Sequence, residues 1–489
     1  MMVNTDKIIH FLTFILTFVT GTLLAQGYEI QVKAQDFAGK EVILAEYFTN
    51  RMVPKDTAQI SLTGDAVFTG DQPFDGGMYV MYFGPKYFFD FLMDRDQVFS
   101  VSVDSTDLVK NTKFAGSTDN ELFYTYKQYL SDQRKLQQQY EAQLAAAGTH
   151  ADSVSIQSKL EDLSTQMNTY VDALISENSD TFFSTFLEAM KEHRAPEELL
   201  KGTKRQQDSI KYVYYKDHYF DTFDPSDVRL LHTPLYEPKI KAYINNIVPQ
   251  HPDSLITAVD MLIEQSRADE DIFRYMLITL FNNFAESKLM GMDKVYFHIA
   301  EQYYIPEATW SSEEFIVKLR DNLEKSKPTF IGNVAPDFEL KGLPTDHFHL
   351  AQMDTAIKSD PHVGFDFRLS DIPAEYTLLY FWEADCGHCK KSTPKLYEVF
   401  EKYKDQQVQV LSVHVINSVE GKIKWVDFVN EHGLYEWINC WSPYKNEFRK
   451  LYNLQSFPQL FLLDKDKKII AKQLTPEQVD DILNRFLSN

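Results

Sequence analysis

Apolar and polar positions alternate along the first part of the chain, from residue 28 to about residue 103. Here Ile30 and Val32 are separated by one polar residue, and turn residues such as Thr63-Gly64-Asp65 interrupt the alternating runs. Successive side chains of a strand point to opposite faces of a sheet, so this period of two predicts strands with one buried face. We therefore expect an antiparallel, sandwich-like β domain over residues 26–112.

The spacing of apolar positions changes at about Thr118. Apolar residues recur three, four and seven positions apart in two stretches, 122–140 and 160–174, with Gly148 in the turn between them. This spacing places them on one face of a helix, and two such helices joined by a short link should pack as an antiparallel hairpin. We expect a helical middle domain over residues 113–327. Its further helical patterns cover residues 238–246, 254–267, 271–284 and 311–325.

From residue 328 to the end, short apolar runs alternate with helical patterns. The runs 376–382, 408–416 and 458–463 predict buried strands. Strand and helix alternation of this kind predicts an α/β sandwich with helices on both faces of the sheet. The fold class is therefore multidomain, α+β and α/β, with the α/β sandwich over residues 328–489. The helical patterns of this part cover residues 387–403, 422–431, 444–452 and 476–487.

The chain begins with a segment typical of export. Lys7 precedes an apolar run over residues 8–24, and Leu23-Leu24-Ala25 offers a cleavage site. We expect residues 1–25 to be a signal peptide, and the mature chain to be exported to the periplasm or cell envelope and soluble there. The alternative is an uncleaved anchor, because the apolar run is almost long enough to cross a bilayer.

The composition excludes several classes of protein. A hydrophobic share of 44% with 25% charged residues is typical of a globular protein, and a net charge of −22 disfavours binding to nucleic acid. The histidines of the middle region, such as His218 and His251, form no ligand pair at helical spacing. We expect no metal and no cofactor.

The candidate chemistry lies at the cysteines. The chain has only three, too few for a disulfide scaffold, and two of them form the sequence Cys386-Gly387-His388-Cys389 between a predicted strand and a predicted helix. At a helix start the unpaired N–H groups and the positive end of the macrodipole stabilise a thiolate, so Cys386 is the expected nucleophile. Cys389, one turn further, is the expected resolving thiol, and His388 and Gly387 are expected to tune the pKa of the pair.

Other interpretations of the pair are weaker. Structural zinc needs four ligands, and no second pair at suitable spacing exists. Covalent haem attachment needs a histidine after the second cysteine, where this chain has Lys390. A structural disulfide remains open. Cys440 stands alone in an apolar segment, and we expect it to be a buried free thiol.

The residues around the pair resemble the periplasmic thioredoxin-like oxidoreductases of the TlpA type over about residues 331–489. The resemblance implies a thioredoxin-like fold and protein thiols and disulfides as partners, with an unknown membrane electron donor or acceptor. It further implies a cis Pro458 packed against the cysteines, with Trp382 and Phe457 at the substrate. The matching residues are Gly332-Asn333-Val334-Ala335-Pro336-Asp337-Phe338, Phe381-Trp382, the cysteine pair, Pro394, Ser456-Phe457-Pro458 and Phe461-Leu462-Leu463-Asp464.

The chain also departs from this family. Acids that assist proton transfer in relatives are replaced by Tyr380 and Ser392, which leaves Glu383 or a water molecule as the candidate substitutes. The segment 341–364 is longer than the usual link. A peroxiredoxin is excluded, because Leu379 and Glu383 occupy the places where its Pro and Thr would be.

Two functions from different classes follow. The first is an exported thiol-disulfide oxidoreductase, with the direction of electron flow undecided. The second is an envelope binding or scaffold protein that uses the first two domains and keeps the thioredoxin fold as a platform. Those first two domains resemble domains of unknown function that precede TlpA-like domains in envelope proteins, which names no activity.

Overall fold

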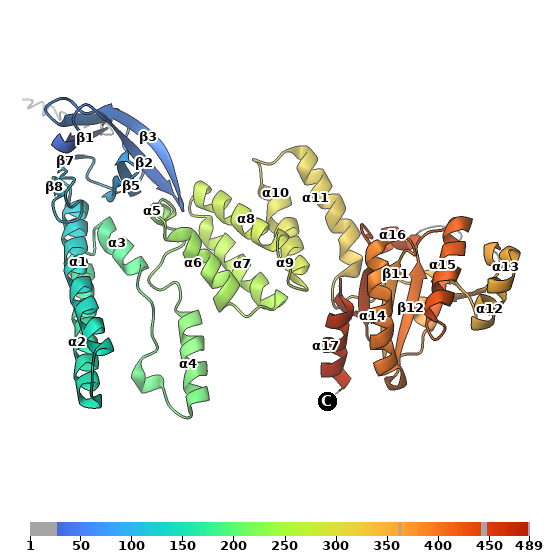
Figure 1. The fold of residues 1–489 in the computed structure, drawn as a ribbon. Coiled ribbons are helices and arrows are strands. Elements are labelled where there is room, and N and C mark those ends of the chain that lie inside the picture. Colours follow the sequence, from blue (N-terminus) through green and yellow to red (C-terminus); the bar gives the residue numbers. More distant parts are fainter. Residues whose placement is uncertain (1–26, 361–362, 442–446, 488–489) are drawn as a thin grey trace, which may run out of the picture. The chain divides into compact units, whose positions relative to one another are not determined.

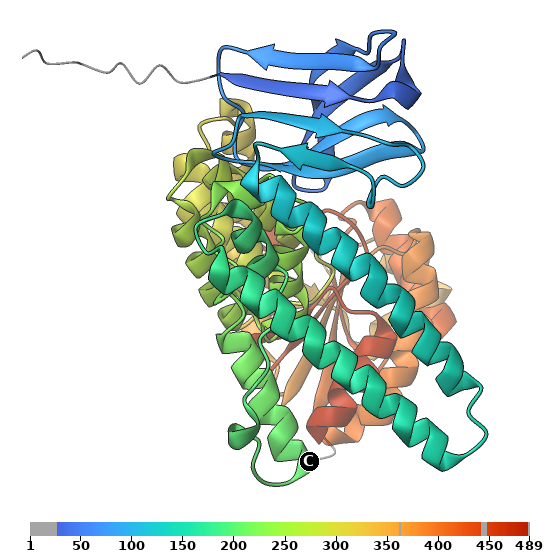
Figure 2. The same ribbon diagram turned by 90° about the vertical axis from the view of Figure 1, so that its left-hand side faces the viewer.

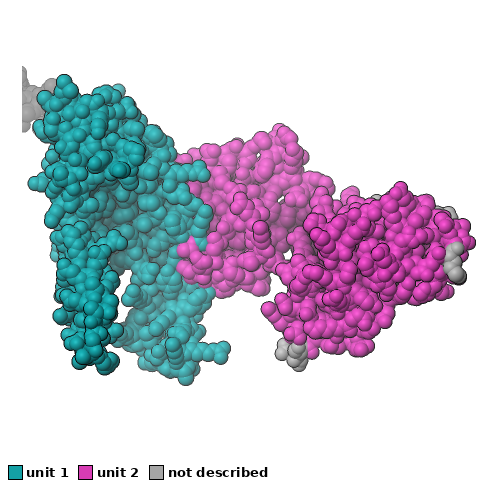
Figure 3. Space-filling view, viewed as in Figure 1, with its two compact units in different colours: residues 1–241 teal, residues 242–489 magenta. Residues whose placement is uncertain are grey.

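The computed structural model describes residues 27–360, 363–441 and 447–487. The predicted signal peptide lies outside the described residues. The chain divides into two compact units, residues 1–241 and residues 242–489, which are coloured separately in Figure 3. The domain boundaries at residues 112 and 327 stay predictions.

The first unit begins with two four-stranded sheets. One has the order β4-β1-β7-β8 and the other β3-β2-β5-β6, and all neighbouring strands are antiparallel except β1 and β7, which run parallel. Aromatic rings fill the core between the sheets, where Phe91 contacts both Phe99 and Phe114. The expected sandwich core is therefore present. The strands are β1 (Tyr28–Lys33), β2 (Glu41–Phe48), β3 (Arg51–Gln59), β4 (Asp65–Gly70), β5 (Gly77–Gly84), β6 (Tyr87–Met93), β7 (Val98–Ser102) and β8 (Lys113–Ala115).

Two long helices, α1 (Thr118–Ala145) and α2 (His150–Glu177), follow the strands and lie side by side in Figure 2. Their seam includes Tyr129 and Tyr170, whose ring centroids are 3.9 Å apart. The hairpin expected from the spacing of apolar residues is confirmed. The remaining helices of this unit are α3 (Phe182–Ala189), α4 (Lys204–Asp217), α5 (Val228–Leu231) and α6 (Tyr236–Ala242), the last of which ends at the unit boundary.

The second unit begins with helices that bury one apolar face each. In α7 (Pro252–Ser266) and α8 (Glu270–Ala285) the buried residues recur at helical spacing, and Asp269 caps α8 by accepting backbone N–H groups. The helices expected in this stretch are thus present. They are followed by α9 (Met292–Ile299), α10 (Ile305–Glu307) and α11 (Glu313–Ser326). None of the helices in the described ranges is long and apolar enough to cross a membrane.

A seven-stranded sheet and its covering helices form the rest of the unit, with the strand order β10-β9-β13-β12-β11-β14-β15. Figure 1 labels two of its neighbouring strands, β11 and β12. The central strands β11, β12 and β13 are parallel, and β14 runs antiparallel to β11. The three long apolar runs predicted as strands became β11, β12 and β14. The strands are β9 (Glu339–Gly342), β10 (Phe365–Arg368), β11 (Tyr376–Trp382), β12 (Val408–His414), β13 (Ile438–Trp441), β14 (Gln459–Leu463) and β15 (Ile469–Lys472).

Side chains of β11 alternate between two hydrophobic cores. Leu378, Tyr380 and Trp382 belong to the core that α14, α15 and α17 cover, whereas Leu379 and Phe381 belong to the core on the opposite face, with residues of α16. Burial on both faces explains why this strand is a continuous apolar run. The helices are α12 (Thr345–Met353), α13 (Thr355–Ser359), α14 (Gly387–Tyr403), α15 (Val419–His432), α16 (Glu447–Leu451) and α17 (Pro476–Leu487).

Candidate active site

Cys386 is the N-cap residue of α14, directly after the loop that follows β11. Its sulfur accepts the backbone N–H of Cys389 at 3.3 Å, a contact that satisfies one of the free donors at the helix start. The Cys386 side chain is half-buried, and that of Cys389 is completely buried. Of the two thiols, only Cys386 can be reached from outside the protein in this structure.

Burial raises the pKa of the Cys389 thiol, and its hydrogen bond with Cys386 raises it further. Cys389 is therefore protonated at neutral pH while both cysteines are reduced. A proton must leave this thiol before its sulfur can attack another sulfur.

A second segment lies against the Cys386 sulfur. The peptide bond between Phe457 and Pro458 is cis, as the resemblance implied, and the Cys386 thiol donates to the Phe457 carbonyl at 3.5 Å. The same segment lines a groove of about 570 Å³ together with His388 and Lys391 of α14. His388 is exposed at this groove. The structure thus brings Cys386, His388, Phe457 and Pro458 together.

Trp382 requires a correction. We expected it at the substrate, but its side chain is 0% exposed, and its indole N–H donates to the Ser412 hydroxyl at 2.8 Å. Its ring packs against His414 and Phe428 in the core. The Trp382 side chain therefore supports the site from beneath, and its complete burial leaves no surface for a substrate to contact. Its place at the end of an apolar strand is compatible with either position, so the sequence alone could not separate them.

His414, at the end of β12, is a residue that sequence reasoning missed. Its ring nitrogen accepts the backbone N–H of Ala384, in the loop before Cys386, at 3.3 Å. Burial lowers the pKa of His414 to about 3, so the imidazole is neutral and can act as an acceptor. A single histidine in an apolar run offers no pattern that reveals such a contact.

Tyr380 stands six residues before Cys386, where the resemblance to thioredoxins led us to expect a buried acid. Its hydroxyl lies 3.0 Å from that of Thr393, which in turn donates to the Cys389 carbonyl at 2.9 Å. Burial raises the pKa of Tyr380, so the phenol stays neutral. This group can connect α14 to the sheet, but it is no base at neutral pH.

The other residues that the sequence pointed to contribute less to the site. A Cβ at Gly387 would meet no atom within 4 Å, so the fold does not require glycine there. Cys440 is buried in β13, as expected, and burial raises its pKa well above the ordinary value. All three cysteines are free thiols. Within the described ranges, no three His, Cys, Asp or Glu side chains are grouped so that they could hold a metal ion.

Comparison with known families matches two stretches of the chain. Residues 196–327 match a domain of unknown function (DUF5106), and residues 374–469 match a model described as thioredoxin-like. The C-terminal part is a thioredoxin-like domain. The sheet order, the cysteine pair at the start of α14 and the cis peptide before Pro458 all belong to this domain.

Individual relatives match the same domain. The thiol-disulfide oxidoreductase ResA of Geobacillus kaustophilus is 29% identical over 153 residues, which are 31% of this chain and 74% of that protein. ResA of Bacillus anthracis is 29% identical over 124 residues, or 25% of this chain and 68% of that protein. A crystal structure of a thioredoxin-like protein from Bacteroides caccae covers 60% of this chain and 97% of its own, with 20% identity and a TM-score of 0.41.

Proposed function

We propose that the protein is a thiol-disulfide oxidoreductase that exchanges disulfides with other proteins through Cys386 and Cys389. One observation carries the proposal: an accessible thiol caps a helix, and a second, buried thiol lies one turn behind it. Relatives of the thioredoxin-like domain are named for the same class of reaction.

In the reducing direction, the Cys386 thiolate attacks one sulfur of a substrate disulfide. A mixed disulfide forms, and the other substrate sulfur leaves as a thiolate. Cys389 then loses its proton and attacks the Cys386 sulfur, which releases the second substrate thiolate. Two electrons have passed to the substrate, whose thiolates take up protons, and the enzyme holds a Cys386–Cys389 disulfide. The same steps in reverse oxidise a substrate dithiol.

The groups around Cys386 have roles in this proposal. The half-buried Phe457-Pro458 segment binds the substrate backbone in the groove beside the reactive sulfur. His388, with Gly387 before it, tunes the stability of the thiolate, because an imidazole at the groove favours the negative sulfur when it carries a proton.

We further propose that the chain acts outside the cytoplasm, in the periplasm or cell envelope, after cleavage before Gln26. Lys7 and the apolar run that follows it support this location. A membrane protein would then supply or accept the electrons. Residues 26–112 and 113–327 would form the two preceding domains of the exported protein.

Insulin reduction by dithiothreitol and reactivation of a scrambled disulfide protein test the proposal. The chain from Gln26 onward should be active in at least one of these assays, and the Cys386→Ser/Cys389→Ser double variant should be inactive. Cys440→Ser is the matched control and should keep full activity, because Cys440 is buried away from the pair. If the wild-type chain equals the double variant, the protein is a binding or scaffold protein instead.

A further inference from the structure

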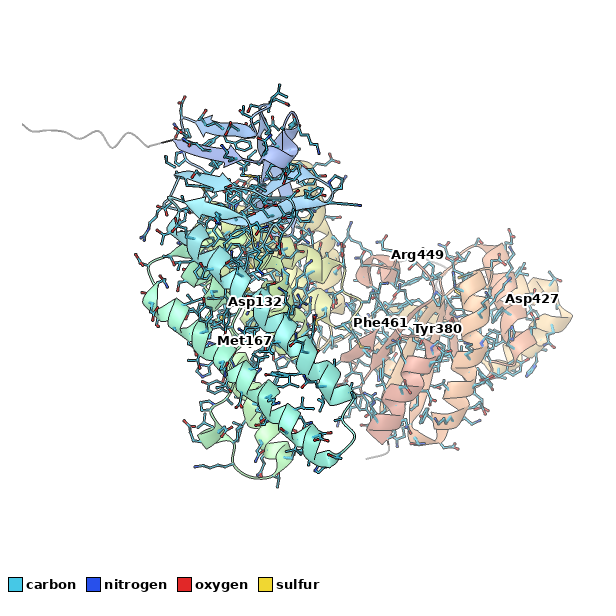
Figure 4. The ribbon with its side chains drawn as sticks, turned by 60° about the vertical axis from the view of Figure 1, so that its left-hand side comes forward. Asp132, Met167, Tyr380, Asp427, Arg449 and Phe461 are labelled. Atoms are coloured by element: carbon cyan, nitrogen blue, oxygen red, sulfur yellow. The ribbon has the colours of Figure 1, made fainter. Side chains whose placement is uncertain are left out.

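Arg449, in α16, joins three segments that are distant in the sequence. One of its terminal nitrogens donates to the Glu383 carboxylate at 3.4 Å and to the Val415 carbonyl at 3.3 Å. Its guanidinium carbon lies 4.9 Å from the centre of the Phe457 ring, within the range of a cation–π contact. Arg449 thus connects the loop after β11, the end of β12 and the segment before β14. Figure 4 labels its position in the domain, together with that of Tyr380.

Two of these three segments contact Cys386 directly. The carbonyl of Glu383 accepts the backbone N–H of Cys386 at 3.3 Å, and the carbonyl of Phe457 accepts its thiol at 3.5 Å. Arg449 holds the side chains of the same two residues. Its guanidinium therefore constrains the backbone on either side of the reactive sulfur.

Glu383 also places a negative charge near the cysteine pair. Burial and the hydrogen bond with Cys386 raise the pKa of Cys389, a hydrogen bond with the Glu383 backbone lowers it, and the negative charges of Cys386 and of the Glu383 carboxylate raise it again. The Glu383 side chain is only 26% exposed and that of Arg449 only 34%, so water screens the pair incompletely. The positive charge of Arg449 beside this carboxylate weakens the effect of the negative charge on the two sulfurs.

We propose that Arg449 is a positioning residue of the redox site, which neutralises Glu383 beside the cysteines and holds Phe457 where the substrate backbone binds. This inference rests on the exchange reaction proposed above. It adds a residue outside the Cys-Gly-His-Cys sequence and the cis-proline segment to the machinery that determines thiolate stability and substrate binding.

Two other ionisable groups near the two cysteines either have a charge partner other than Arg449 or are neutral. Asp385 is paired with Lys424 at 2.8 Å, and His414 is neutral at the pH of the reaction because of its burial. The further titratable groups facing the site are Tyr380, His388, Lys390, Lys391, Lys395 and Glu477. These groups are unchanged in the variants below, so differences between variants report on Glu383 and Arg449.

The first experiment is a pH titration of thiolate absorbance in the reduced full chain. Arg449→Gln should move the midpoint upward by about 0.5 to 1 pH unit, because the uncompensated Glu383 disfavours a thiolate. Glu383→Gln should move it downward, because Arg449 is then the uncompensated charge. The double variant should return close to the wild-type midpoint. Such strong non-additivity is expected of interacting charges and not of general loss of structure.

The second experiment measures KM and kcat for a disulfide peptide. Arg449→Lys keeps the charge and should keep the wild-type midpoint, but it loses the planar group over Phe457 and should raise KM severalfold more than it lowers kcat. Arg368→Gln is the matched control. It removes an arginine of β10 that is paired with Asp337 and Glu339, and both measurements should be unchanged.

An unchanged midpoint in Arg449→Gln, or a double variant that behaves like Arg449→Gln, overturns the proposal. Circular dichroism of each variant distinguishes these results from unfolding, and Glu383→Gln tests the same charge without altering Arg449. The titration needs no substrate. If the wild-type chain fails in the exchange assays, the proposed function falls, while the titration still decides whether Arg449 neutralises Glu383 at the cysteines.

Discussion

In the first unit the buried carboxylate Glu46 is surrounded by partners, whereas in the thioredoxin-like domain the Cys386 thiol is accessible on one side. Glu46 lies 2.5 Å from Lys55, 2.8 Å from His232 and 3.1 Å from the hydroxyl of Tyr79. Its side chain is 3% exposed. A buried charge with this many partners connects elements of the fold, here β2, β3 and β5 with the residue after α5.

Cys386 lies in the opposite kind of environment. Its hydrogen-bonding contacts are the backbone N–H of Cys389 and the backbone carbonyl of Phe457, a residue that lines the groove. A nucleophile requires an open approach for its substrate, so full enclosure would prevent its reaction. Burial of a polar group thus indicates a structural role when its partners enclose it, and a chemical role when one side is left open.

The largest expected effect separates the two cysteines. Cys386→Ser should reduce exchange to the uncatalysed background, because the attacking sulfur is lost. Cys389→Ser should keep the attack and accumulate mixed disulfides with substrates, because nothing resolves them. Non-reducing gels and mass spectrometry measure the adducts. Adducts formed by Cys386→Ser but not by Cys389→Ser would show that the two roles are reversed.

Glu46→Gln tests whether the enclosed carboxylate stabilises the fold. Removal of one partner from a buried ion pair leaves the other uncompensated, so we expect a loss of about 3 kcal/mol in the unfolding free energy of the first unit. Exchange activity should be unchanged at temperatures where the variant is folded. Glu41→Gln, at an exposed position of the same strand, is the matched control and should cost little. Urea unfolding, monitored by fluorescence, supplies both values.

The pH dependence of the unfolding free energy is a second test of the role of Glu46. Burial acts to raise the pKa of Glu46, but hydrogen bonds and charges from His232 and Lys55 outweigh it, and the net pKa is lowered from 4.5. The stabilisation from a lowered pKa is complete above the unfolded value and is lost as pH falls through the folded value. Between pH 7 and the acid range, the wild-type first unit should therefore lose more stability than Glu46→Gln. Urea titrations at pH 7 and at an acid pH measure these losses of stability. If the wild type and Glu46→Gln lose the same amount, the charged form of Glu46 does not stabilise the first unit.

The smallest expected effect concerns His388 at the open site. His388→Pro removes an imidazole that can stabilise the thiolate, so the pair should become more reducing by tens of millivolts, where about 30 mV corresponds to 1.4 kcal/mol. Equilibration with glutathione buffers at fixed pH measures the potential. A potential that stays unchanged or becomes less negative would remove the reason to prefer oxidation or isomerisation over reduction.

Patterns local in the sequence were sufficient for much of this protein. The continuous apolar runs predicted β11, β12 and β14, and the spacing of apolar residues predicted the α1–α2 hairpin. The cysteine pair was recognisable as a candidate site because its two residues and its helix start are adjacent in the chain. Such features depend on side-chain period and on groups within one turn, and both are visible in a single segment.

The tertiary structure alone decided the rest. The four-residue strands β9, β10, β13 and β15 are too short for a period to appear, and they form because the sheet offers them partners. Trp382 is a core residue because α15 covers its face of the sheet. Arg449 and Glu383 are 66 residues apart and meet only when the two segments fold together. Contacts at such separation depend on how elements pack, and packing is a property of the whole chain that no local pattern contains.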